Sequence, residues 1–143
     1  MLFMVLGIVR AQQQRVQWLL PYFPMLRSWA DELVRTTEFP ADQICTDDFT
    51  GKLANNTNLG AKGIIALETF AELCRIVQSE VGAAGAAAVR ATDCAHYTSV
   101  ASAYAKTWMS YAHTTDGASP HYKMSFNDLK GIDDSWSIKC VAI

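Results

Sequence analysis

The sequence predicts an all-α chain built from about four helices that are joined by long loops. Apolar residues recur at intervals of three and four over four separate stretches, which is the period of an amphipathic helix. Proline and glycine gather mainly between these stretches, where they mark turns and loops. Half of the 143 residues are apolar and the length is common for one domain, so we expect a single domain over residues 1–143.

The N-terminal part of the chain predicts two helices. The first is expected from Met1 to about Gln14 as a core helix, because its apolar run of nine residues is much shorter than the roughly 20 that span a membrane. No positive charge precedes this run and Arg10 follows it, so we expect neither a membrane partner nor a signal peptide. The second helix is expected from about Pro24 to Arg35, since proline is tolerated in a first turn and not inside a helix.

A long connection should separate these helices from the third. Residues 36–57 carry Pro40, Gly51 and many small polar side chains, so we expect a loop without regular structure that regularly spaced apolar residues keep ordered. The third helix is expected from about Asn58 to Ser79. The small side chains of its first half should let another part of the backbone approach closely.

The C-terminal part predicts one more helix and an irregular tail. A turn is expected around Gly82 and Gly85, followed by a helix from about Asp93 to Ala112. The aromatic residues of this helix should pack in the core, with Tyr and Trp able to present polar tips at the edge of a cleft. Residues 114–143 look like loops with one short strand near Tyr122.

Composition excludes several classes of function. The net charge is −2 and the isoelectric point is near 5.8, so the chain has no basic field for phosphates and nucleic acid is not an expected partner. The three histidines show no metal-ligand spacing, and we expect neither a metal nor a cofactor. A serine-hydrolase elbow and a His-Glu-x-x-His zinc motif are also absent from the sequence.

The four cysteines, Cys45, Cys74, Cys94 and Cys140, lie far apart without a C-x-x-C pair, which argues against a zinc site or a thioredoxin-type redox motif. Their even number leaves disulfides open. We favour buried free thiols, because Cys74 falls inside an apolar helical pattern.

The densest polar stretch of the chain, residues 46–63, begins with two carboxylates. Asp47 and Asp48 are candidate catalytic residues, because hydrolysis can use one carboxylate to activate water and another to donate a proton. Adjacent side chains in an extended segment point opposite ways, so the second carboxylate must come from elsewhere, and Asp134 is a candidate. The alternative is that Asp47 or Asp48 closes a turn or caps a short helix.

The same stretch offers a candidate binding site for a small polar substrate. Asn55, Asn58 and Lys62 are spaced by three and four, so they share one face if the third helix begins slightly early. The start of that helix carries free N–H groups and a partial positive charge, which suit a substrate carboxylate. The alternative is local capping by Asn58 with Lys62 facing solvent.

This polar stretch and its surroundings resemble the fungal glutaminase A family. The resemblance covers nearly the whole chain and rests on motifs that occur in that family's order: Trp29-Ala30-Asp31, Thr46-Asp47-Asp48-Phe49-Thr50-Gly51, Leu53-Ala54-Asn55-Asn56-Thr57-Asn58-Leu59, Lys62-Gly63-Ile64, Tyr97-Thr98-Ser99, His121-Tyr122 and Asp133-Asp134-Ser135-Trp136-Ser137.

The resemblance implies a fold and an activity. The fold is an (α/α)6 toroid of the six-hairpin glycosidase type, and the activity is hydrolysis of L-glutamine to L-glutamate and ammonia. It also implies an extracellular protein and a small-molecule substrate, glutamine or a sugar, to which we assign Asp134 and Trp136 as further binding residues.

The chain departs from the family at both ends. No Pro-Val-Glu-Glu-like segment precedes the first helix, and by the resemblance the glutamates of that segment are better candidates than Asp134 for the second carboxylate. The residues after Lys139 do not continue the family pattern, and Cys45 stands where serine is usual. We therefore expect a fragment whose partners are the missing parts of its own toroid. The alternatives are a non-catalytic helical fragment and a glycoside hydrolase-like domain of the same fold.

Overall fold

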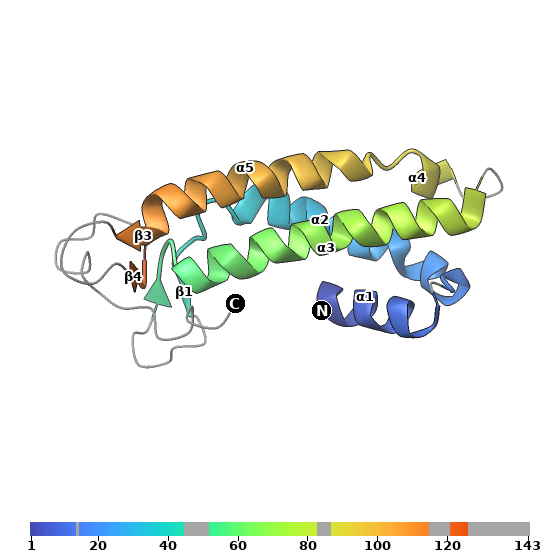
Figure 1. Ribbon diagram of the computed structural model, residues 1–143, viewed down its shortest axis with the longest axis horizontal. Coiled ribbons are helices and arrows are strands. Elements are labelled where there is room, and N and C mark those ends of the chain that lie inside the picture. Colours follow the sequence, from blue (N-terminus) through green and yellow to red (C-terminus); the bar gives the residue numbers. More distant parts are fainter. Residues whose placement is uncertain (14, 45–51, 83–86, 115–120, 126–143) are drawn as a thin grey trace. The chain divides into compact units, whose positions relative to one another are not determined.

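The computed structural model describes residues 1–13, 15–44, 52–82, 87–114 and 121–125 (Figure 1). Helices dominate these residues. The elements in chain order are α1 (Leu2–Ala11), the 3-10 helix η1 (Gln17–Tyr22), α2 (Phe23–Thr36), β1 (Gln43–Ile44), β2 (Lys52–Leu53), α3 (Thr57–Val81), α4 (Ala87–Arg90), α5 (Cys94–Ala112), β3 (His113–Thr114) and β4 (His121–Tyr122).

The all-α class and the four long helices are confirmed. Helices α1, α2, α3 and α5 occupy the four predicted stretches, and their ends differ from the predicted ends by at most three residues. Pro21 lies within η1, and Pro24 is the second residue of α2, where its missing N–H costs no intrahelical hydrogen bond. Within the described residues, no helix is both long and apolar enough to cross a membrane.

The contacts divide the chain into two units, and the division falls inside α3 and α5. The first unit comprises residues 1–35 and 65–101, and the second comprises residues 36–64 and 102–143.

The core of the first unit is centred on Phe70 of α3. The Phe70 ring lies 5.8 Å from the ring of Phe23 and meets the ring of Tyr97 edge-on at 4.7 Å, between ring centroids in both cases. Such tilted and edge-on pairs add to the free energy that burial of the rings provides. The other buried apolar residues around them include Leu2, Leu6, Val9, Leu19, Leu26, Ala30, Leu67, Leu73 and Val77.

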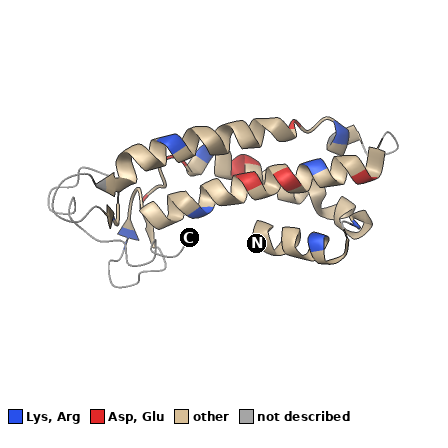
Figure 2. Cartoon of the chain, in the orientation of Figure 1, with Lys and Arg blue, Asp and Glu red and all other residues tan. Residues whose placement is uncertain are grey.

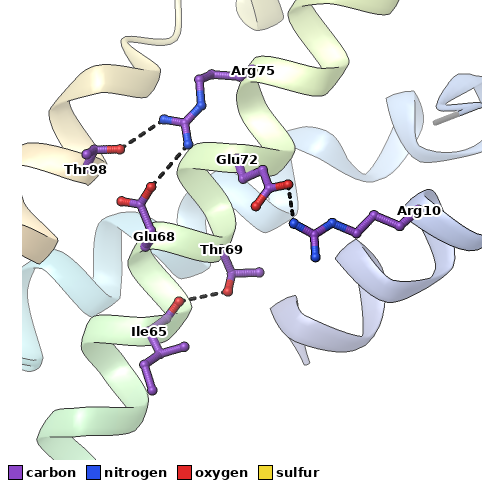
Figure 3. Close-up of polar contacts among 7 residues, drawn as sticks. All are labelled: Arg10, Ile65, Glu68, Thr69, Glu72, Arg75 and Thr98. Carbon is purple, nitrogen blue, oxygen red and sulfur yellow. Dashed lines mark hydrogen bonds and ion pairs between the residues drawn. The ribbon is translucent and has the colours of Figure 1, made fainter.

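Polar contacts on the surface of the first unit join α3 to α1 and to α5 (Figure 3). Arg10 of α1 pairs with Glu72 at 2.6 Å, while Arg75 reaches Glu68 at 3.1 Å and the Thr98 hydroxyl at 3.0 Å. Acidic and basic residues both occur along α3 (Figure 2). Because these side chains are largely exposed, each pair contributes only about 0–1 kcal/mol to stability.

Cys74 and Cys94 form a disulfide between α3 and the first residue of α5. The prediction of free thiols is therefore wrong for this pair. The apolar helical position of Cys74 suits a buried disulfide as well as a buried thiol, so the pattern alone does not separate the two. Cys45 and Cys140 lie outside the described residues.

The connection between α3 and α5 is fixed by one amide side chain. Gln78 donates from Nε2 to the carbonyl oxygens of Val89, at 2.9 Å, and of Thr92, at 2.8 Å. Gly82 has a φ of +52°, which agrees with the predicted turn, whereas Gly85 lies outside the described residues. Asp93 then caps α5 by accepting hydrogen bonds from the backbone N–H groups of residues 95 and 96.

The second unit contains two antiparallel strand pairs beside the ends of α3 and α5. Strand β1 pairs with β2 in the register Gln43↔Leu53, and β3 pairs with β4 in the register His113↔Tyr122. The prediction of a connection without regular structure over residues 36–57 is thus wrong in part. Strands of two residues are too short to produce a periodic pattern, which explains why the sequence does not reveal the first pair.

Candidate functional site

The candidate site lies where β2 leads into α3. The residues between these elements form a turn in which Asn55 has a φ of +50°, a left-handed conformation that asparagine tolerates better than most residues. The backbone N–H of Asn55 donates to the carbonyl oxygen of Pro40 at 2.7 Å. The conformation and the hydrogen bond together direct the chain into the helix.

Asn56 caps α3. Its Oδ1 atom accepts a hydrogen bond from the backbone N–H of Leu59 at 3.0 Å, which satisfies one of the free donors of the first turn. The side chain is buried, with 1% of its surface exposed, and its backbone forms a β-bridge with Ser125. The alternative reading in which Asn58 caps the helix is therefore wrong, because Asn56 performs this role.

Three further contacts from distant segments hold the turn. The Ser125 hydroxyl donates to the carbonyl oxygen of Ala54 at 2.8 Å, and the Thr57 N–H donates to the carbonyl oxygen of Met124 at 3.0 Å. Trp108 of α5 donates from Nε1 to the Thr57 carbonyl oxygen at 2.8 Å. The backbone around the first residue of α3 is thus fixed before any ligand arrives.

The structure brings together two of the three predicted binding residues of this region. Helix α3 begins at Thr57, so Asn58 and Lys62 are four residues apart on one helical face. Asn55 precedes the helix by two residues and does not share that face, contrary to the prediction. Asn58 is 8% exposed and takes no part in the hydrogen bonds that hold the turn, while Lys62 is exposed and takes part in none of the ion pairs among the described residues.

Thr57 is a candidate that the sequence does not reveal. Its side chain has no exposed surface, and its Oγ1 atom has no hydrogen-bond partner among the described residues. A buried hydroxyl without a partner costs about 1–3 kcal/mol. No sequence signal distinguishes this threonine from one that bonds its own helix, as Thr69 does to the carbonyl oxygen of Ile65.

The first turns of α3 pack tightly against the residues that follow α2. A Cβ atom at Gly63 would lie 3.0 Å from the Cβ atom of Thr37 and closer still to its methyl group. Thr37 is buried, so it has little room to move. A close approach occurs at Gly63, but the expectation that backbone makes it is wrong, because the approaching group is the side chain of Thr37.

An aromatic cluster adjoins the start of α3. The rings of Trp108 and Tyr122 lie 4.9 Å apart between centroids with a tilt of 33°, and the ring of His113 meets Tyr122 edge-on at 5.3 Å. All three side chains are half-buried. Trp108 uses its one polar atom to bond the backbone of the turn.

Glu38, which follows α2, interacts with two residues of α5. Glu38 accepts a hydrogen bond from the Thr107 hydroxyl at 3.1 Å. The pKa of Tyr104 is raised, mainly by burial and in addition by the negative charge of Glu38.

Four predicted site residues, Asp47, Asp48, Asp134 and Trp136, lie outside the described residues. Asp47 and Asp48 belong to the connection between β1 and β2, whose ends are brought together by the pairing of Ile44 with Lys52. Over the part of the chain that the structure describes, no group of three His, Cys, Asp or Glu residues could hold a metal ion.

Comparisons with known proteins identify relatives of the chain. All of residues 1–143 match the family model of the glutaminase A six helical-hairpin domain. A glutaminase A from Aspergillus oryzae is 30% identical over 131 residues, which cover 90% of this chain and 17% of that protein. A protein described as a probable glutaminase, from Arthroderma benhamiae, is 28% identical over 111 residues, which cover 78% of this chain and 11% of that protein. The chain thus spans less than a fifth of either relative, and no solved structure matches it.

Proposed function

Because this chain belongs to the glutaminase A six helical-hairpin domain family, we propose that it contributes the substrate-binding turn of a hydrolase that converts L-glutamine and water to L-glutamate and ammonia. Both relatives carry the name glutaminase. The chain spans a small part of each, so the activity is proposed for the protein to which this domain belongs.

One observation carries the proposal: hydrogen bonds to other segments hold the backbone at the start of α3, and polar side chains there take no part in those bonds among the described residues. Thr57 offers a buried hydroxyl that has no partner in the part of the chain that the structure describes, and Asn58 offers an amide that takes no part in the described hydrogen bonds of the turn. Lys62 adds a positive charge one helical turn further along. Amide, hydroxyl and ammonium groups at a helix N-terminus suit the carboxylate and the carboxamide of glutamine.

The proposed chemistry is general acid–base hydrolysis. Asp47 or Asp48 removes a proton from water, the water oxygen attacks the side-chain carboxamide carbon, and the carbon–nitrogen bond breaks as the nitrogen is protonated and leaves as ammonia. The second carboxylate comes from another segment, and Asp134 is the candidate within this chain. Trp136, in the same C-terminal cluster, is proposed as a binding residue.

An extracellular location is part of the proposal. The Cys74–Cys94 disulfide supports it, because disulfides form and persist in oxidising compartments and are rare in the cytosol.

The test is ammonia release from L-glutamine by the folded full-length protein to which this domain belongs, measured by a coupled glutamate assay. We expect Asp47→Asn or Asp48→Asn to lower kcat by about 100-fold or more, the usual contribution of a general base. Lys62→Ala should raise KM by about tenfold with little change in kcat, because it removes one charge-assisted contact.

Lys106→Ala is the matched control, since Lys106 is another exposed lysine of the same unit. It should leave both kinetic constants unchanged. A folded protein that releases no ammonia from glutamine, or that loses no activity in either aspartate variant, would contradict the proposal.

A further inference from the structure

Helix α1 carries apolar side chains on two opposite sides. Three of them are buried in the core of the first unit: Leu2, Leu6 and Val9. Phe3, Met4 and Ile8 are instead 50%, 68% and 45% exposed. At about 100° per residue these three side chains fall on the side of the helix that faces away from the buried ones, and they form what we call the outer face of α1.

The one charged residue of α1 does not make the outer face polar. Arg10 reaches from α1 toward α3, where its guanidinium group pairs with the carboxylate of Glu72 at 2.6 Å (Figure 3). Figure 2 accordingly shows a single basic position on α1 and no acidic one. The outer face therefore presents large apolar side chains to solvent, with no charge among them.

Helix α2 of the same unit shows the contrasting pattern of an ordinary surface helix. Its buried side carries apolar residues, and its exposed side carries mainly polar and charged ones, among them Ser28, Asp31, Glu32 and Arg35. A helix that is apolar all round is instead typical of a position inside a larger protein or in a membrane. With ten residues, α1 is far shorter than the roughly 20 that span a membrane.

The character of the outer face favours a permanent protein partner. A helix that lies in a membrane surface carries a strongly charged face rich in lysine and arginine, whereas the only charge of α1 is already paired with α3. Transient protein interfaces are about as polar as the rest of the surface, while permanent ones resemble a domain core cut in half. The outer face of α1 has the second composition.

The family provides a source for such a partner. Its domain consists of six helical hairpins, and the part of the chain that the structure describes contains four long helices, fewer than six hairpins need. The chain also spans less than a fifth of either relative. Further helices of the same polypeptide are therefore the partners nearest at hand for an uncovered apolar helix.

We propose that an apolar helix of the same polypeptide, from a hairpin outside residues 1–143, packs on the outer face of α1 and buries Phe3, Met4 and Ile8. The side of that helix that contacts α1 is apolar and uncharged, because Arg10 is engaged with Glu72 and no other charge of α1 is available to pair with it. Helix α1 is then an inner helix of the complete domain. This role does not depend on the reaction proposed above.

The test uses the full-length protein to which this domain belongs. Hydrogen peroxide converts accessible methionine to its sulfoxide, and mass spectrometry measures the rate at Met4 in the native and in the urea-unfolded protein. We expect oxidation to be several-fold slower in the native protein, because the covering helix excludes the oxidant. Similar rates in the two states, which an exposed fraction of 68% would give, would overturn the proposal.

Photo-crosslinking identifies what covers the outer face. Full-length protein is prepared with photo-methionine in place of methionine, and light and isotope-heavy copies are mixed with phosphatidylcholine vesicles before irradiation. A crosslink from Met4 to a peptide of the same copy outside residues 1–143 is the expected result. Crosslinks of Met4 between light and heavy copies, to lipid, or only to peptides within residues 1–143 would overturn the proposal and would identify a second copy, a membrane surface or this chain itself as the cover.

A charge on the outer face provides an independent check. Met4→Glu should lower the melting temperature of the full-length protein, because it places a carboxylate without a partner under the covering helix. Ser28→Glu is the matched control, since Ser28 lies on the exposed side of α2, and it should change the melting temperature little. Equally small shifts in both variants would overturn the proposal. The oxidation and crosslinking measurements need no variant, so they decide the question even if Met4→Glu does not fold.

Discussion

The indole Nε1 atom of Trp108 donates a hydrogen bond to the carbonyl oxygen of Thr57, with 2.8 Å between the two atoms. This bond joins the last turns of α5 to the first residue of α3. The N–H of Thr57 bonds a third segment at Met124, so both backbone groups of this residue are held from outside the helix. The fold therefore determines where the polar groups of the candidate site stand, and side chains at this junction should affect binding as well as stability.

Trp108→Phe should lower the free energy of unfolding by about 0.5–1.5 kcal/mol, because it removes the hydrogen bond and keeps an aromatic ring. Urea denaturation followed by circular dichroism measures this change. Trp18→Phe is the control, since Trp18 also donates to a backbone carbonyl oxygen but only to Arg15, three residues away. An equal loss of stability in both variants would show that the hydrogen bond between α5 and α3 contributes no more than a local hydrogen bond does.

Gly63→Ala should destabilise the protein by about 1–3 kcal/mol, even though alanine favours helix more than glycine does. The added Cβ atom would meet the side chain of Thr37 at distances that real Cβ contacts do not reach. Gly7→Ala in α1 is the matched control, because a Cβ atom there has nothing within 4 Å, and it should be neutral or stabilising.

A double variant tests whether contact with Thr37 causes the loss of stability in Gly63→Ala. Thr37→Ala removes the hydroxyl and the methyl group that the new Cβ atom would meet, so combining it with Gly63→Ala should recover part of the lost stability. Thermal melting of the four proteins provides the comparison. Strictly additive losses would contradict the close approach of Thr37 and Gly63.

Long helices could be predicted from the sequence because their apolar period extends over many residues. In α3 the spacing of Leu67, Phe70, Cys74 and Val77 predicts a buried stripe, and all four are fully buried. The same spacing does not state which helix covers each residue. For this reason the pairing of Cys74 with Cys94 could not be predicted, although the position of Cys74 in the core could.

The details of the candidate site were less predictable, because they depend on a shift of one or two residues. Three asparagines within four positions offer three candidates for the cap of α3, and only the position of the first helical residue selects Asn56. The backbone N–H of Asn55 bonds Pro40 and that of Thr57 bonds Met124, and both partners lie far from the turn in the sequence. Local patterns do not contain this information.

Removal of the Cys74–Cys94 disulfide should destabilise the first unit by about 3 kcal/mol, the value expected for a bridge that closes a loop of about 20 residues. Urea denaturation of the double variant Cys74→Ala/Cys94→Ala against wild type measures the change. Alkylation followed by mass spectrometry provides the check on the bonding: labelling of Cys74 and Cys94 without prior reduction would contradict the bridge.

Stability should fall in alkaline solution because of Tyr97. Burial is the main cause, and the hydrogen bond that its hydroxyl donates to Asp31 at 2.5 Å adds to it, so that the pKa of the phenol rises from 10.0 to about 12. Below pH 10 the phenol is protonated in both the folded and the unfolded state, and its contribution is complete. Between pH 10 and 12 only the unfolded state loses the proton, so the free energy of unfolding declines and the contribution is lost above the folded pKa.

Denaturation at a series of alkaline pH values measures the slope with which the free energy of unfolding falls as pH rises. Tyr97→Phe should flatten it, because phenylalanine has no proton to lose, whereas Tyr111→Phe, at an exposed position of α5, should leave it unchanged. An identical slope in wild type and Tyr97→Phe would assign the effect to other groups.

Asn56 and Asn58 should respond to substitution in opposite ways, although they are two residues apart. Asn56→Ala removes the cap of α3 and a buried hydrogen bond, so it should cost about 0.5–2 kcal/mol of stability. Asn58→Ala removes an amide that no bond of the turn requires, so its melting temperature should stay close to that of wild type, while its affinity for L-glutamine should fall by about tenfold. Calorimetry and thermal melting on the same two variants separate the roles.

A large loss of stability in Asn58→Ala with unchanged affinity would make Asn58 a structural residue and would leave Thr57 and Lys62 as the binding groups of α3.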